Sequence, residues 1–329
     1  MKEFFKIFIV IFVFIITFIG VSRLVSPKYV DTLIEGSLTR DYYESPKDHE
    51  LIVLGDCEVY SAVNPNVLFE NHGIKAFNRA NAQQTILQSY YLLKETLYYE
   101  TPKYVMLSVG ALRTTEKNEA YNRLLLDDMK WSKEKVELIK ATKTEGETYL
   151  SYIFKLLRYH SRIIQLTKED FVRLPFNNGM VSHSGFIINK NVVPLENLPT
   201  KRELNNYSFD ETNIEYLDKI VKLCEENNIQ LILFKSISEY PYWYSEYDDY
   251  LTIYAQKNSL DYYNFNKDIK KIGIDYNTDT YDGGMHLNLY GANKFSKYLG
   301  DVLSSKYEFT NGKGDPLYHD LMIRYKYAI

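Results

Sequence analysis

The feature that most constrains the fold is a short apolar run that ends in a glycine–aspartate–cysteine turn. Residues 51–54 read Leu-Ile-Val-Leu, and Gly55, Asp56 and Cys57 follow directly. An apolar run of this length, bounded by a turn, is typical of a strand buried in a parallel sheet. Ligands bind such sheets at the carboxyl ends of the strands. The run therefore predicts that the Cys57 thiol lies at the ligand-binding edge of an α/β sheet.

A second motif lies far downstream, in a glycine-rich loop. Residues 281–288 read Tyr-Asp-Gly-Gly-Met-His-Leu-Asn, so Asp282 and His286 lie close together before a predicted helix. A thiol, an imidazole and a carboxylate can act as nucleophile, base and orienting group. Asp-Gly-Gly alone is also an ordinary turn. It is the pair of motifs, at opposite ends of one α/β pattern, that indicates a catalytic set.

Between the two motifs, strands and helices alternate. Further strands are predicted at 75–77, 104–110, 229–235 and 261–265, with helices between them. This alternation implies a three-layer α/β sandwich with a mostly parallel five-stranded sheet. Residues 113–210 interrupt the rhythm as a helical insertion after the third strand. Their stretch 176–199 is rich in Asn, Gly and Pro, is too long for a passive connection, and is interpreted as an insertion or cap over the site.

The first 25 residues predict a transmembrane signal anchor, since roughly 20 apolar residues span a bilayer. A cleaved signal peptide is the rival interpretation, but the nearest approach to an Ala-x-Ala site is Gly20-Val21-Ser22. Two basic residues lie on each side of the run, which leaves the positive-inside rule nearly undecided. The short N-terminal flank favours a single-pass protein of the cell membrane with its large domain outside the cytoplasm.

The remaining boundaries follow from composition. Residues 26–48 are predicted to be a stalk or linker, residues 49–307 the α/β domain, and residues 308–329 a loosely packed tail. A net charge of −4 with scattered Lys and Arg excludes a nucleic-acid footprint. The two cysteines are too few for a disulfide framework. Cys224 falls on a helical apolar face and is expected in the core, and a bridge from it to Cys57 is the alternative.

Taken together, the two motifs resemble the SGNH/GDSL hydrolase superfamily. The chain is most similar to a membrane-anchored branch in Gram-positive bacteria, related to teichoic-acid D-alanylation and alginate-acetylation proteins. The similarity extends to residues 88–94 and 240–243. It implies a flavodoxin-like SGNH fold with Cys57 in place of the usual serine nucleophile, His286 as base and Asp282 as acid. The family spacing is Asp-x-x-His, whereas here one more residue intervenes, so Asp279 is the reserve acid.

The resemblance also implies an oxyanion hole. Its donors would be the backbone at Cys57 and near Ala80 and Asn81. The family's Gly-x-Asn-Asp turn reads Gly-Ala-Leu-Arg here, so the asparagine is missing. Loss of one such donor costs roughly 10²–10³ in rate. Gly110 and Arg113 of this turn are candidate substrate contacts, with a solvated charge as the alternative for Arg113.

The reactivity expected of the Cys57 thiol depends on its pKa. An unperturbed cysteine has a pKa of about 8.5, and an imidazolium or a helix N-terminus lowers it. Both are expected near Cys57. The resulting thioester would suit transfer to a sugar hydroxyl at least as well as hydrolysis. Glu58, the next residue, is interpreted as a solvated surface side chain, and the alternative is that its negative charge opposes thiolate formation.

The sequence therefore predicts an extracytoplasmic, membrane-anchored acyltransferase or esterase that acts on cell-envelope polysaccharide. Its expected partners are a cell-envelope glycan or teichoic-acid-like polymer, a membrane-bound O-acyltransferase and the lipid bilayer. No cofactor is expected, and a zinc site built from Cys57, Asp282 and His286 lacks the usual ligand spacing. The alternative is a catalytically inactive scaffold that binds glycan or organises an envelope-modification complex. The missing asparagine and the thiol in place of a hydroxyl favour that alternative. A thiol-redox function is disfavoured because the chain has no Cys-x-x-Cys.

Overall fold

The core of the protein is a five-stranded parallel sheet. A computed structural model describes residues 2–30, 32–114, 117–173 and 179–329. The strands are β1 (Leu51–Gly55), β2 (Ala76–Ala80), β3 (Tyr104–Ser108), β4 (Gln230–Lys235) and β5 (Asp261–Asn264). They are arranged in the order β2-β1-β3-β4-β5, and every pairing is parallel. The α/β prediction is confirmed, and the strand order is that of flavodoxin-like sheets.

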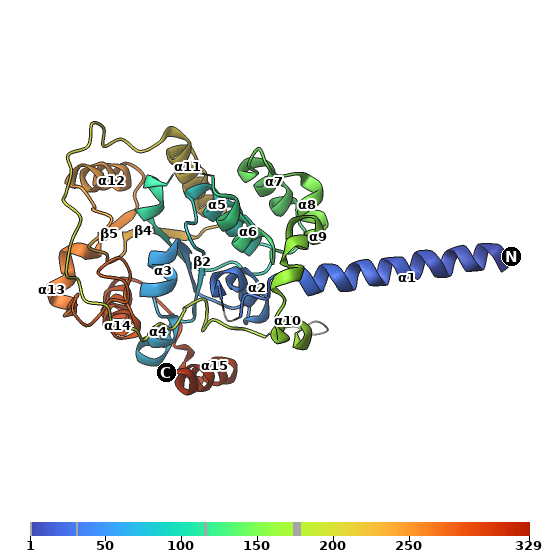
Figure 1. Cartoon of the computed structure of the whole chain (residues 1–329). Helices are drawn as coiled ribbons and strands as arrows, with labels where there is room; N and C mark the ends of the chain where they lie inside the picture. Colours follow the sequence, from blue (N-terminus) through green and yellow to red (C-terminus); the bar gives the residue numbers. More distant parts are fainter. Residues whose placement is uncertain (1, 31, 115–116, 174–178) are drawn as a thin grey trace.

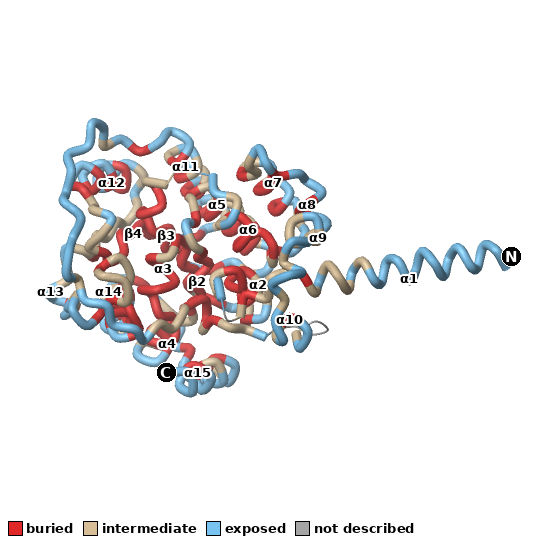
Figure 2. Tube along the Cα trace, in the orientation of Figure 1, coloured by how far each residue is buried: buried red, intermediate tan, exposed pale blue. Residues whose placement is uncertain are grey.

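Helices cover both faces of this sheet (Figure 1). Side chains alternate along β1, so Leu51 and Val53 enter one core cluster while Ile52 and Leu54 enter the other. The first cluster includes side chains of α3 (Cys57–Ala62), α4 (Pro65–His72), α14 (Leu289–Lys306) and α15 (Pro316–Ala328). The second includes side chains of α2 (Leu38–Glu44), α5 (Ile86–Thr96), α11 (Glu211–Glu226) and α12 (Ser245–Lys257). Figure 2 shows both clusters as the buried interior. The short η4 (Phe265–Asp268) and α13 (Ile269–Ile272) follow β5.

The helical insertion after β3 is confirmed, but its helices do not lie where a cap would. Its elements are η2 (Val109–Arg113), α6 (Glu119–Leu126), α7 (Lys133–Thr142), α8 (Tyr149–Ile153), α9 (Lys155–Tyr159), η3 (His160–Gln165) and α10 (Lys168–Val172). The elements α9, η3 and α10 contact α1 (Lys2–Val25) at the side of the body from which α1 projects (Figure 1). At the carboxyl edge of the sheet lie η2, which directly follows β3, and the extended segment after residue 179. Residues 176–178 of the predicted loop lie outside the described residues.

Both segments that we expected to flank the domain are packed into the body. The expected stalk, residues 26–48, contains η1 (Ile34–Ser37) and α2, and Leu38 and Tyr42 are buried. The expected loose tail contains η5 (Gly312–Gly314) and α15. Spacings of four and three residues place Tyr318, Met322 and Tyr325 on one buried face of α15. In both segments, tyrosines take up buried positions of the apolar pattern. Because tyrosine has a polar hydroxyl, the sequence of both segments looked polar.

Helix α1 stands apart from the rest of the chain. It is long and apolar enough to cross a membrane, a property that N-terminal signal sequences share. Residues 2–17 are exposed, whereas the last turns lie against the insertion.

Candidate active site

Cys57 lies at the carboxyl end of the central strand β1. All five residues of β1 are buried. Only glycine fits at Gly55, because a Cβ atom there would lie 2.4 Å from Val59 Cγ2 and 2.7 Å from Ser108 Cβ. The next residue, Asp56, caps α3 by accepting a 3.0 Å hydrogen bond from the Glu58 backbone N–H. Cys57 is therefore the first residue of α3, half-buried, at the predicted edge of the sheet.

His286 and Asp282 are held together in the loop before α14. Gly283 and Gly284 have φ values of 73° and 99°, a region that favours glycine, and this turn brings the carboxylate back to the histidine. The His286 backbone N–H donates to Asp282 Oδ1 at 2.8 Å, and His286 Nδ1 lies 2.5 Å from Asp282 Oδ2. The unusual Asp-x-x-x-His spacing thus still pairs the two side chains.

The reserve acid, Asp279, has other partners. Its buried carboxylate accepts from the Asp275 backbone N–H at 2.8 Å and from Lys294 Nζ at 2.7 Å. These bonds tie the start of the loop to α14. The geometry therefore gives the histidine to Asp282 and leaves Asp279 as a loop support.

The imidazole of His286 also interacts with the Cys57 thiol. Burial alone would lower the pKa of His286, but hydrogen bonds to Asp282 and to Cys57 raise it to about 10. Because Nδ1 faces the carboxylate, Nε2 is the nitrogen left for the sulfur. The structure thus brings a thiol, an imidazole and a carboxylate into one chain of contacts.

The pKa of Cys57 is raised, in contrast to the expectation from the sequence. Burial raises it first and the charge of Asp56 second, and both outweigh the lowering by His286. The helix N-terminus that was expected to lower the pKa is occupied by the Asp56 carboxylate. Burial, followed by the charge of Glu58, raises the pKa of Asp56 itself to about 6, so Asp56 remains mostly ionised at neutral pH.

Directly behind the thiol lies a buried ionic network that the sequence did not reveal. Glu58, expected on the surface, is only 5% exposed. Its Oε2 accepts from Lys235 Nζ at 2.7 Å, and its Oε1 accepts from Ser238 Oγ at 3.1 Å. Burial would raise the pKa of Glu58, but the charges of Lys235 and Arg113 hold it below its ordinary value. The available sequence signal was Lys235 at the end of an apolar strand.

Asn81 is the most informative of the predicted oxyanion residues. Ala80 ends β2 opposite Gly55, and the Asn81 backbone N–H already donates to the Gly55 carbonyl at 3.3 Å. The Asn81 side-chain Oδ1 accepts from the Ala82 N–H at 2.8 Å, which fixes the orientation of the amide. Its Nδ2 is buried and has no hydrogen-bond partner within the described part of the chain. A free donor thus comes from the side chain and not from the expected Asn81 backbone N–H.

Gly110 and Arg113 support the network behind the thiol. A Cβ at Gly110 would lie 3.1 Å from Glu58 Oε2, so this glycine leaves room for the carboxylate. Arg113 Nη2 lies 3.7 Å from Glu58 Oε1, and its guanidinium lies 5.5 Å from the centre of the Trp243 ring. Arg113 is thus partly engaged by protein groups and is not a simple solvated charge.

The extended segment after residue 179 borders this arrangement. The Ile187 N–H donates to the Tyr60 carbonyl of α3 at 3.0 Å, and the Val193 N–H donates to the Thr280 carbonyl at 3.0 Å. The segment therefore connects α3 with the loop that carries His286.

The described residues include no group of three His, Cys, Asp or Glu side chains placed to hold a metal ion. Cys57 and Cys224 are both free thiols, and Cys224 is buried on α11.

Comparisons with known proteins find similar backbones but no sequence relatives. No protein-family model and no curated protein matches the chain. A GDSL-like lipase from Bacteroides thetaiotaomicron aligns with 82% of this chain and 98% of its own, at 11% identity and a TM-score of 0.37. A protein assigned to the G-D-S-L lipolytic family, from Desulfitobacterium hafniense, covers 78% of this chain and 100% of its own, at 14% identity and a TM-score of 0.39. An acetyl xylan esterase covers 78% of this chain and 98% of its own, at 10% identity and a TM-score of 0.38. Similarity this low assigns no activity, so function has to come from the site.

Proposed function

We propose that this chain is an SGNH-type acyl-transferring enzyme, an esterase or O-acyltransferase, that uses Cys57 as nucleophile. The observation that carries the proposal is that His286, 2.5 Å from the Asp282 carboxylate, also interacts electrostatically with the Cys57 thiol at the carboxyl edge of the sheet. These groups come from the two ends of the α/β core. Packing alone does not require that a thiol, an imidazole and a carboxylate lie next to one another in this order in space.

In the proposed reaction, His286 Nε2 takes the proton of the Cys57 thiol as the sulfur attacks the acyl carbonyl. The acyl carbon–oxygen or carbon–sulfur bond of the donor breaks, and the leaving group takes a proton from His286. Asp282 holds Nδ1–H and stabilises the imidazolium. An acceptor hydroxyl or water, deprotonated by His286, then attacks the thioester, the carbon–sulfur bond breaks, and His286 returns the proton to the sulfur of Cys57.

The carbonyl oxygen of the reacting acyl group needs hydrogen-bond donors. The buried Nδ2 of Asn81, without a partner among the described residues, supports a role as one donor, because Asn81 is bonded to the strand end from which Cys57 continues. Preorganised donors of this kind are among the largest contributions to acyl-transfer catalysis.

The acceptor and the location remain parts of the proposal. A hydroxyl of a cell-envelope polysaccharide is our proposed acceptor, with a membrane-bound acyl donor protein as partner, because the two motifs resemble envelope-modifying proteins. Helix α1, which meets the length and composition of a membrane span, is the proposed anchor. The large domain would then lie outside the cytoplasm.

Trapping of the acyl-enzyme tests the function directly. The full chain in detergent is incubated with 4-nitrophenyl acetate, and the intact mass is measured over time. We expect one acetyl group on Cys57 in the wild type. The matched control is Cys224→Ala, which removes the other thiol and should still form the adduct. Cys57→Ala should form none, and His286→Ala should form it far more slowly.

The raised pKa of Cys57 favours one second candidate, an inactive scaffold that binds glycan. Alkaline buffer separates the two functions. One outcome is that, at high pH, iodoacetamide alkylates Cys57 while the ester transfers no acetyl group to it. This result would contradict the proposal of an enzyme and support that of a scaffold.

A further inference from the structure

The helical insertion exposes a band of large apolar side chains that the proposed function does not use. We call this band the apolar collar. It comes from α8, α9, η3 and α10, and the exposure of its side chains ranges from 41% to 87%. Its members are Leu150, Ile153, Phe154, Leu157, Ile163, Ile164, Phe171 and Val172. Contiguous apolar surface of this kind on a soluble protein marks an interaction site.

The apolar collar is continuous with the apolar surface of α1. The rings of Phe18 on α1 and Phe154 on the collar lie 5.7 Å apart, edge to face. A groove between the two surfaces is lined by apolar side chains of α1 and of α8 and α9. Figure 1 shows α9 and α10 at the point where α1 leaves the body.

Polar bonds fix the base of α1 to the same insertion. Arg162 Nη1 donates to the Val25 carbonyl at 2.7 Å, and Arg162 Nη2 donates to the Asp170 carboxylate at 3.2 Å. Lys28 Nζ lies 3.6 Å from the same carboxylate. The helix is thus held in a fixed direction relative to the collar, and no flexible stalk separates them.

The length of α1 decides what covers the collar. Its wholly exposed part, residues 2–17, is about 24 Å long at 1.5 Å per residue. The hydrocarbon core of a bilayer is about 30 Å thick. The exposed part alone is therefore too short to span it. The full apolar stretch from Phe4 to Val25 reaches about 33 Å, but its last two turns are packed against the collar.

We propose that the apolar collar sinks into the outer boundary of the bilayer, at the level where headgroups meet acyl chains. This inference rests on α1 as the anchor in the proposed function. If α1 spans the bilayer at full thickness, about one turn of its packed end lies inside the lipid, and the part of the collar packed against that turn must lie there too. The exposed Arg23 and Lys168 can extend to lipid phosphates from the same level.

A protein partner could also cover an apolar surface, but the length of α1 favours lipid. A partner explains the exposed side chains without explaining why the exposed part of α1 is about 6 Å, or about one turn, shorter than the hydrocarbon core. Immersion of the collar accounts for both.

Depth-dependent quenching tests the proposal on the full chain. The chain carrying Ile164→Cys is labelled with an NBD fluorophore and reconstituted alone into phosphatidylcholine–phosphatidylglycerol vesicles. Ile164 is 87% exposed, so a label there should not disturb the fold. The matched control is Leu317→Cys on α15, which is 60% exposed and lies outside the collar. The wild type, labelled in parallel, gives the background from Cys57 and Cys224.

At position 164 we expect a blue-shifted emission, strong quenching by doxyl-labelled lipids and weak quenching by aqueous iodide. At position 317 we expect the reverse. A label at Ile11→Cys reports on the anchor independently. Lipid quenching at position 11 together with iodide quenching at position 164 would overturn the collar and leave the anchor intact, and would also be the result if the natural cover is a protein. Loss of lipid quenching at both positions would overturn the anchor and the collar together, while acetylation of Cys57 would still test the chemistry separately.

Discussion

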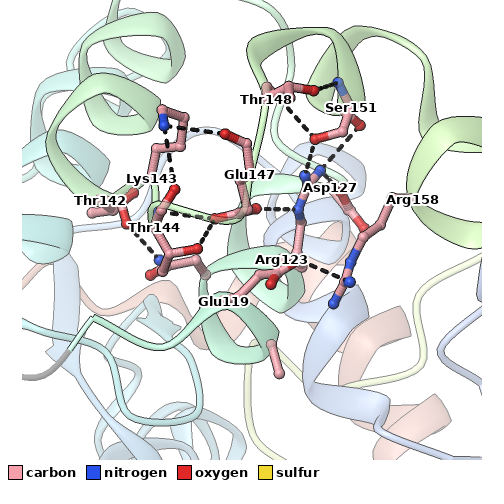
Figure 3. A network of polar contacts seen from close by, with 12 residues as sticks. Glu119, Arg123, Asp127, Thr142, Lys143, Thr144, Glu147, Thr148, Ser151 and Arg158 are labelled. Carbon is pink, nitrogen blue, oxygen red and sulfur yellow. Dashed lines mark hydrogen bonds and ion pairs between the residues drawn. The ribbon is translucent and has the colours of Figure 1, made fainter.

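Two of the buried ionic networks of the protein lie in different settings, one beside Cys57 and one in the insertion. In the insertion, Arg123 Nε donates to Glu147 Oε1 at 2.8 Å, and Arg123 Nη2 donates to Ser151 Oγ at 2.6 Å (Figure 3). The guanidinium also lies 3.6 Å from the centre of the Tyr152 ring. At the sheet edge, Glu58, Lys235 and Ser238 form the second network.

The difference between the networks is one of neighbours. The insertion network joins α6 to the start of α8, and the residues that Figure 3 labels include neither a cysteine nor a histidine. The network at the sheet edge adjoins the Cys57 thiol along the chain, and the charge of Glu58 contributes to the raised pKa of Cys57. Burial of charge by itself therefore does not distinguish the two networks. What distinguishes the network beside Cys57 is its place at the carboxyl ends of the strands, next to the proposed nucleophile.

The largest expected effect is a chemical one at the sheet edge. Asp282→Asn removes the group that holds Nδ1–H of His286, and such a change typically lowers the rate roughly 10⁴-fold. The measurement is the rate of Cys57 acetylation by 4-nitrophenyl acetate. The counterpart in the insertion, Glu147→Gln, should leave this rate unchanged. Equal rates for Asp282→Asn and the wild type would remove Asp282 from the mechanism.

Loss of the cation from either network should lower stability by a similar amount. Lys235→Met leaves Glu58 buried without its partner, and Arg123→Met does the same to Glu147. Removing one member of a buried pair costs roughly 3–5 kcal/mol. Denaturant unfolding of the full chain in detergent measures the loss.

The same two variants should differ in the reactivity of Cys57. Without Lys235 the carboxylates beside the thiol are less neutralised, so alkylation of Cys57 by iodoacetamide should slow, whereas Arg123→Met should not change it. A double variant, Glu58→Met with Lys235→Met, should recover much of the stability because neither charge remains. Equal alkylation rates in both single variants would show that the network at the sheet edge is only structural.

A smaller effect is expected from the proposed oxyanion donor. Asn81→Ala removes the buried Nδ2 and should slow Cys57 acetylation roughly 10²–10³-fold. Alkylation by iodoacetamide, which develops no oxyanion, should stay near the wild-type rate. A fall in both rates would indicate a disturbed loop, because Asn81 also accepts the Ala82 N–H.

The sequence predicted what depends on local pattern. Apolar runs bounded by turns located the buried strands, and the rule that ligands bind at strand carboxyl ends placed Cys57 beside the loop of His286. The parallel sheet and the insertion after β3 followed from the order of these runs. These features depend on periodicity and chain order, which a single sequence carries.

What the sequence missed depends on contacts between distant residues. Glu58 on α3 looked solvated because its partner, Lys235, lies far along the chain at the end of β4. The pKa of Cys57 was expected to be low because Asp56 was not recognised as the residue that occupies the helix N-terminus. The segment at 26–48 looked like a stalk because the sequence does not show that the Tyr42 ring packs against Phe77 in the core.

The smallest effect concerns pH and sharpens the contrast between the networks most directly. Burial and the charge of Asp56 raise the pKa of Cys57, so the thiol keeps its proton at neutral pH. This proton must leave before the sulfur can react, so wild-type alkylation should rise with pH through the alkaline range. Asp56→Asn keeps a capping side chain for α3 but removes a negative charge that disfavours the thiolate. Its alkylation profile should therefore shift to lower pH, whereas Asp127→Asn in the insertion should leave the profile unchanged. If the alkylation profile of Asp56→Asn does not shift, burial alone sets the pKa of Cys57. The charged groups near the thiol would then affect its reactivity no more than those in the insertion do.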